Sequence, residues 1–200
     1  MLEKNPLRKR NQSGFSLAEL LIVFFIIAII VVLALPQIMS SRRLFRFGGV
    51  QRQVVSALRE ARQEAMSQRT PITLRYSNVS KTMTLSGGSL GSVGDSKNRI
   101  FQLAGEGLTV DEVVYGRPSG ASVAALGDGT NLTSLSANLL DITFQPDGSV
   151  IDASNNPQNK ALFFYSSETP DETAFAVSIL GAGGRAKVWR YSSNVNTYVE

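Results

Sequence analysis

The feature that most constrains this chain is an unbroken apolar run from Phe15 to Leu35. The run covers about 21 residues, which as an α-helix would be about 30 Å long and would match the hydrocarbon core of a bilayer. Its one charged residue is Glu19. A carboxylate within hydrocarbon costs about 2.5 to 3.5 kcal/mol on insertion scales, so this residue needs a partner. We therefore expect a membrane helix over residues 15–35 with a special role for Glu19.

Three hypotheses account for the apolar run. A secretory signal peptide, cut after Ala34, would have an apolar region of about 7 to 15 residues followed by a polar stretch, whereas this run continues directly into Pro36. A plain membrane anchor explains the length and the basic residues before the run, but it gives Glu19 no role. The third hypothesis rests on the residues around Gly14.

After a basic leader, the chain reads Gly14-Phe15-Ser16-Leu17-Ala18-Glu19-Leu20-Leu21. This motif resembles the processing site of type IV pilins and type II secretion pseudopilins. The resemblance implies that a prepilin peptidase cuts between Gly14 and Phe15 and methylates the new N-terminus, so that residues 1–14 are a cleaved leader. It also implies that Glu19 acts in assembly and that Pro36 bends the helix.

Physical chemistry supports the role that the resemblance gives to Glu19. Cleavage would create an ammonium group at Phe15, about 6 Å from Glu19 along the helix axis. A neighbouring subunit can supply this ammonium group, and the resulting ion pair replaces an isolated charge in a medium of low dielectric constant. Other pilins or pseudopilins are therefore the expected partners of the helix.

The basic charge of the chain, with a pI near 9.6, lies at its N-terminal end. Residues 1–14 are net +3 and residues 15–69 net +4, whereas residues 70–200 are net −3. Cations lie on both sides of the apolar run, in the leader and at Arg42, Arg43 and Arg46, so a charge count does not orient the helix. The resemblance implies a cytoplasmic leader, a single pass through the bacterial inner membrane, a head outside the cytoplasm, and an inner-membrane assembly platform as a further partner.

The chain has no cysteine and no histidine. It therefore lacks a disulfide, a thiol nucleophile, the commonest general base and the commonest zinc ligand. We expect no catalytic residue, no metal site and no cofactor, and hence a protein that is not an enzyme.

Residues 36–69 continue the helix in amphipathic form. Apolar residues recur at steps of three or four, at Phe47, Val50, Val54, Leu58, Ala61 and Ala65. The stripe covers too few heptads for a coiled coil, so we expect it to pack on the head of the same chain. Pro71 is expected to end the helix.

From residue 70 the pattern is that of strands. The expected strands are Ile72–Tyr76, Lys81–Leu85, Ile100–Leu103, Leu108–Tyr115, Leu139–Phe144, Ala161–Tyr165, Phe175–Leu180 and Lys187–Tyr191. Residues 86–98 and 116–138, rich in Gly, Ser and Ala, are expected to be surface loops. The predicted fold class is α+β: a long N-terminal helix, half transmembrane and half amphipathic, packed on an antiparallel β-rich head over residues 70–200.

The head carries a resemblance of its own. The segments concerned are Ala61-Arg62-Gln63-Glu64-Ala65, Phe144-Gln145-Pro146-Asp147-Gly148-Ser149, Ala176-Val177 and Gly184-Arg185. Their arrangement is similar to that of the H-type minor pseudopilins of type II secretion and the T- and U-type minor pilins of type IV pili. The resemblance implies a structural minor subunit of a pseudopilus or pilus, which supports protein secretion or pilus assembly, and a type IV pilin-like fold.

Some of these minor pilins bind DNA through a C-terminal Gly-Arg-x-Arg element. The matching residues here are Gly184-Arg185-Ala186-Lys187, which depart from the element at the last position. On a strand, Arg185, Lys187 and Trp189 would share one face, and Arg190 is a further candidate contact. The alternative is an edge strand whose charges prevent aggregation, which we favour because the head is net acidic. DNA binding is the second functional hypothesis.

Overall fold

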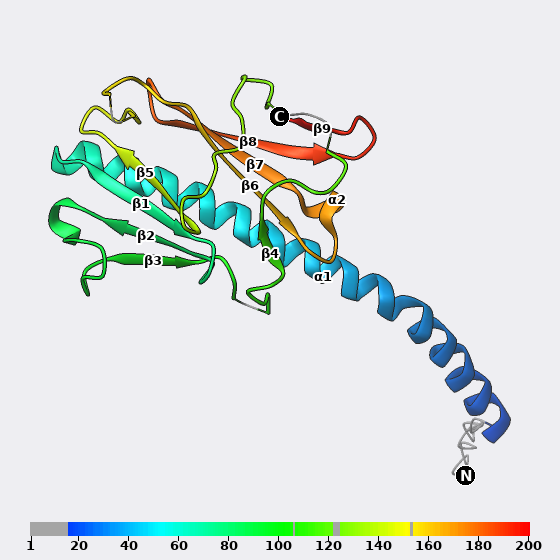
Figure 1. The fold of residues 1–200 in the computed structure, drawn as a ribbon. Helices are drawn as coiled ribbons and strands as arrows, with labels where there is room; N and C mark the ends of the chain where they lie inside the picture. Colours follow the sequence, from blue (N-terminus) through cyan, green and yellow to red (C-terminus); the bar gives the residue numbers. More distant parts are fainter. Residues whose placement is uncertain (1–15, 106, 122–124, 153) are drawn as a thin grey trace, which may run out of the picture. The chain divides into compact units, whose positions relative to one another are not determined.

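The computed structural model describes residues 16–105, 107–121, 125–152 and 154–200. Within these residues the long helix is α1 (Leu17–Gln68), and two short helical turns are η1 (Gly88–Leu90) and α2 (Pro170–Thr173). The strands are β1 (Ile72–Ser77), β2 (Thr82–Ser86), β3 (Arg99–Gln102), β4 (Val113–Tyr115), β5 (Leu139–Phe144), β6 (Lys160–Ser166), β7 (Phe175–Leu180), β8 (Arg185–Ser192) and β9 (Thr197–Val199). Figure 1 shows their arrangement.

The chain divides into two compact units, Met1–Arg42 and Arg43–Glu200, and α1 belongs to both. In the first unit, residues Leu17–Leu35 form a helix that is long and apolar enough to cross a membrane. Almost all of their large apolar side chains are exposed. The expected membrane helix is therefore present as a helix, and its side chains need a surrounding of lipid or of other helices.

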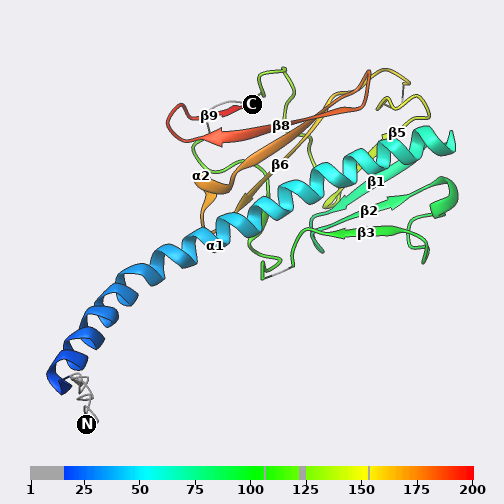
Figure 2. The same ribbon diagram turned by 180° about the vertical axis from the view of Figure 1, so that it is seen from behind.

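The described residues of the second unit form two antiparallel sheets. One has four strands in the order β3-β2-β1-β5, and the other has five in the order β4-β6-β7-β8-β9. In Figure 1 the two sheets lie on one side of the part of α1 that belongs to this unit, residues 43–68, and in Figure 2 this part of the helix runs in front of them. The predicted α+β class, a helix with an antiparallel head, is confirmed.

One hydrophobic core joins α1 to the inner faces of both sheets. The apolar stripe of α1 enters it as expected, because each of its members is at most 2% exposed: Phe47, Val50, Val54, Leu58, Ala61 and Ala65. From the sheets come the alternate residues that face the helix, such as Leu74 of β1, Ile142 of β5 and Val177 of β7. The prediction that the stripe packs on the chain's own head is confirmed.

A smaller cluster lies on the outer face of the five-stranded sheet. It is built from the residues that alternate with the core residues, namely Phe163 of β6, Ala176 of β7 and Trp189 of β8. Leu126, from the expected surface loop 116–138, is buried in this cluster. The expectation that this stretch is only a surface loop is therefore corrected, because part of it covers one side of a sheet.

Other differences from the expected elements are local. Residues 108–112 do not form the start of a strand: residues 110–112 are a turn, in which the amide of Glu112 donates to the carbonyl of Thr109 at 3.2 Å. Strand β2 is shifted by one residue, to Thr82–Ser86. The turn α2 and the strand β9 were not expected. Strand β9 is only three residues long, with Tyr198 as its one buried side chain, and so has no measurable alternation.

Candidate functional site: an assembly helix and an arginine groove

Glu19 lies in the first turn of α1, among exposed apolar side chains. A carboxylate there is favoured by the unpaired amides and the positive dipole end of the helix. The proposed cleavage pair, Gly14 and Phe15, lies outside the described residues, and so does the side chain of Pro36. The backbone of α1 continues as helix through Pro36. The assembly roles of these four residues stay predictions.

The three cations proposed as DNA contacts lie in different surroundings. Lys187 is on the outer face of β8, where its Nζ lies 4.5 Å from the centre of the Trp189 ring and 2.6 Å from an oxygen of Glu200. Arg190 lines a hollow on the α1 side together with Glu172. Arg185 lines a groove beside α1. Strand alternation places Arg185, Lys187 and Trp189 on one side of β8, as expected, because Ala186 and Val188 face the main core.

The expectation that this strand is the sheet edge is corrected in part. Strand β9 is the outermost strand, and it pairs with β8 from Arg190 to Ser192. Residues 185–189 have a strand partner only on the β7 side, among the strands that the structure describes. The first half of β8 therefore has one unpaired backbone edge, where its cations oppose pairing with another chain.

Three of the sequence segments that carry the resemblance to minor pilins meet at one end of the head. Gly148, in the turn after β5, has a φ of +81°, and an added Cβ would lie 3.0 Å from Nε of Arg62. Gly184, before β8, has a φ of +56°, and its added Cβ would collide with the carbonyl oxygen of Gly148. These two glycines are required by close packing of two turns against the helix.

The turn around Gly148 is closed by its own hydrogen bonds. The amide of Gly148 donates to the carbonyl of Gln145 at 2.8 Å, and Asp147 accepts from the hydroxyl and the amide of Ser149 at 2.6 and 2.8 Å. These bonds from Ser149 lower the pKa of Asp147. The turn fixes the chain where it meets Gly184, which is a structural task.

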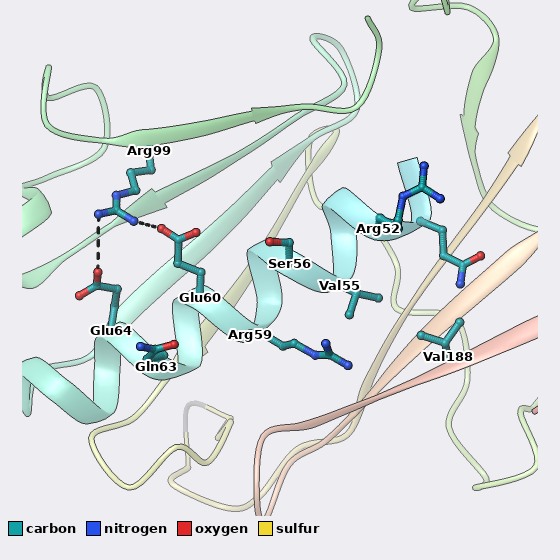
Figure 3. Close-up of a pocket in the computed structure, with 10 residues that line it drawn as sticks. Arg52, Val55, Ser56, Arg59, Glu60, Gln63, Glu64, Arg99 and Val188 are labelled. Atoms are coloured by element: carbon teal, nitrogen blue, oxygen red, sulfur yellow. Dashed lines mark hydrogen bonds and ion pairs between the residues drawn. The ribbon is translucent and has the colours of Figure 1, made fainter. Parts of the chain in front are cut away.

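A groove runs along the exposed side of α1, beside β8. It consists of two adjoining hollows of about 730 and 690 Å³, which share Arg59 and Gln63 in their walls. We call it the arginine groove after four of its lining residues: Arg52, Arg59, Arg62 and Arg185. Figure 3 shows the first hollow, with Arg59 pointing away from Arg99, toward the side of Val188.

Two glutamates in the first hollow are occupied by a different arginine. Glu60 forms an ion pair with Arg99 of β3, and Glu64 lies 3.9 Å from the same guanidinium group. These interactions raise the pKa of Arg99, the hydrogen bond with Glu60 being the larger cause. The carboxylates on this side of α1 therefore do not neutralise the arginine groove.

A buried network on the outer face of the five-stranded sheet was not predicted. The hydroxyl of Ser178 donates to Asp128 at 2.6 Å and accepts from Nε1 of Trp189 at 2.9 Å. Burial opposes ionisation of Asp128, but hydrogen bonds from Ser178 and Thr130 outweigh it, so the pKa lies below its ordinary value. The network fastens the loop at residue 128 to β7 and β8.

Comparisons with known proteins identify the family. The model of the type II transport protein GspH matches residues 51–184, which is more than half of the chain. The chain belongs to the GspH family. The model of the prokaryotic N-terminal methylation motif matches residues 9–35, which include Gly14, Phe15 and Glu19.

GspH-family proteins are structural subunits and not enzymes, in agreement with the sequence-based expectation. Among solved structures, the GspH-family chain is similar to the crystal structure of the type IV minor pilin FimU of Pseudomonas aeruginosa. The two are 17% identical, with a TM-score of 0.42, over 70% of this chain and 88% of that one. No match was found among curated proteins.

Proposed function

We propose that this GspH-family chain is a minor subunit of a type II secretion pseudopilus or a type IV pilus, incorporated through its N-terminal helix. The observation that carries the proposal is the exposed apolar segment Leu17–Leu35, with Glu19 as its one charge, which lies within the methylation motif matched over residues 9–35. In this role the chain supports protein secretion or pilus assembly and performs no chemistry of its own.

The proposal has a defined sequence of partners. A prepilin peptidase removes residues 1–14 and methylates Phe15, and the mature chain stays in the bacterial inner membrane with its head outside the cytoplasm. The assembly platform then transfers it into the filament, where Glu19 meets the N-terminal ammonium group of a neighbouring subunit. The net charge of +3 in residues 1–14 favours retention of the leader on the cytoplasmic side.

Substitution of Glu19 tests the proposal. Glu19→Leu removes a charge from the apolar run, so its level in the membrane should equal or exceed that of the wild type. It leaves the neighbour's ammonium group without a partner, and loss of one member of a buried pair costs about 3 to 5 kcal/mol, so incorporation into filaments should fall steeply. Glu19→Asp, which keeps the charge, is the matched control.

The measurement compares the membrane level of each variant with its level in sheared filaments, in cells that contain the assembly machinery. If Glu19→Leu and wild type are incorporated equally at equal membrane levels, Glu19 has no role in assembly and the plain-anchor hypothesis is the one that fits.

DNA binding on an uptake pilus is the second hypothesis, and it has less support. Of its three candidate contacts, Lys187 is paired with Glu200, and Arg190 lies on the other face of β8. The test is binding of duplex DNA by the full chain in detergent. Phosphate contacts through these residues would give an affinity that falls steeply with salt, and a smaller salt slope in Arg185→Gln.

A further inference from the structure

We propose that the arginine groove is the docking site for an acidic, exposed segment of the adjoining pilin subunit. The proposal rests on the proposed role as a filament subunit, and it names a contact between heads in addition to the contact made by the apolar helices. All four arginines lie within the unit Arg43–Glu200, so the groove is a property of the head.

The first argument is that three arginines of α1 in the groove are unpaired. Among the residues that the structure describes, Arg52, Arg59 and Arg62 have no carboxylate within ion-pair distance. The nearby Glu60 and Glu64 are directed to Arg99. The lining therefore holds an excess of positive charge, whose mutual repulsion is relieved when an anionic group binds.

The second argument is a buried donor. Nε of Arg62 is shielded from solvent and has no hydrogen-bond acceptor in the described part of the chain. It lies where the helix meets the turns of Gly148 and Gly184, next to Arg185. Buried polar groups are nearly always hydrogen-bonded in proteins, so this donor favours an acceptor at this end of the groove.

The third argument selects a protein segment over a nucleic acid. Apolar side chains alternate with the arginines along the groove: Val55 and Val188 in the first hollow, Leu58 and Met66 in the second. Such a lining suits a segment that carries both carboxylates and apolar side chains. A phosphate backbone carries no apolar side chains to place against these residues.

A subunit with a head like that of this chain presents acidic segments. Residues 70–200 of this chain are net −3. The turn α2 exposes Asp171 and Glu172, and neither has an ion pair in the described part of the chain. An acidic surface that faces a basic groove is electrostatically complementary to it, and such complementarity sets the register and orientation of neighbouring subunits.

Site-directed photo-crosslinking tests the proposal, because the natural chain has no cysteine. Ser56→Cys places a thiol in the first hollow, on the exposed side of α1. Val79→Cys, in the exposed turn between β1 and β2, is the control position. Each full-length variant is labelled with a photo-reactive maleimide in cells that assemble filaments, and the crosslinked peptides are identified by mass spectrometry.

We expect Ser56→Cys, but not Val79→Cys, to crosslink to a net-acidic segment of another filament subunit. Adding Arg52→Glu and Arg59→Glu should lower this adduct by about fivefold or more, because each reversal turns an attraction into a repulsion. Reversal of the acids in the identified segment should restore it.

Three results would overturn the groove proposal, provided that the chain is present in sheared filaments. They are an adduct with a neutral or basic segment, an adduct with DNA, and an adduct level no higher than that of Val79→Cys. The filament role would then stand. Absence of the wild-type chain from sheared filaments would instead overturn the filament role, and the groove proposal with it.

Discussion

Replacement of Gly184 by alanine tests how the head is held together. Gly184 has a φ of +56°, in the left-handed region, and an added Cβ collides with the carbonyl oxygen of Gly148. Backbone atoms cannot move aside as a flexible side chain does, so the two turns must separate. The neighbouring Gly183 is the matched control, because it has no positive φ and an added Cβ meets no atom within 4 Å.

The structure sets the size of the expected effect. An alanine in the left-handed region costs about 1 to 2 kcal/mol. Forcing a methyl group into closely packed surroundings costs about 1 to 3 kcal/mol more. We therefore expect Gly184→Ala to lower the free energy of unfolding by about 2 to 5 kcal/mol, whereas Gly183→Ala should change it by less than about 0.5 kcal/mol.

Trp189 provides the assay, because it is the one tryptophan of the chain and is buried in the head. Urea unfolding of the full-length protein in detergent micelles can be followed by its fluorescence. With a slope of about 2 kcal/mol per M, the midpoint of Gly184→Ala should fall by about 1 to 2.5 M relative to wild type. Coincident curves for Gly184→Ala and Gly183→Ala would refute the packing of these two turns.

Three further outcomes are expected from the same unfolding assay. Ser178→Ala should cost about 1 to 3 kcal/mol, because it leaves Nε1 of Trp189 without an acceptor and removes one of the donors to Asp128. An unchanged midpoint would contradict the network. Because the pKa of Asp128 is lowered in the folded state, its contribution to stability should be complete above about pH 5 and lost as the pH falls below about 4. Asp128→Asn should remove this part of the acid dependence, and identical stability profiles of variant and wild type at low pH would contradict the prediction. Phe47→Ala should cost about 3 to 5 kcal/mol, since Phe47 is buried against Phe175, and a loss below about 1 kcal/mol would show that α1 is not part of the core.

The sequence predicted the elements that have a strong period. The stripe of α1 repeats at helical spacing, and strands such as β1 and β5 alternate over five or six residues, so their buried faces follow from the pattern alone. The burial of Leu126 could not be predicted in the same way. It is an isolated apolar residue in a stretch rich in glycine and serine, and only the outer face of a sheet formed elsewhere gives it a partner.

The same difference between local pattern and tertiary contact separates the two candidate sites. Glu19 was found because one charge in an apolar run is visible in the sequence. The arginine groove was not, because Arg59 and Arg62 come from α1 and Arg185 from β8, and no local spacing relates a helix to a strand so distant in the chain. The one available signal was that Arg62, Gly148 and Gly184 all belong to the segments shared with minor pilins.

The N-terminus of the chain recovered from sheared filaments tests the central claim most directly. Intact-mass and fragment spectra should show a chain that begins at Phe15 and carries one methyl group, at a level that depends on the carboxylate of Glu19. A filament-borne chain that still begins at Met1, or a chain that begins at Leu35 and is absent from filaments, would contradict the account.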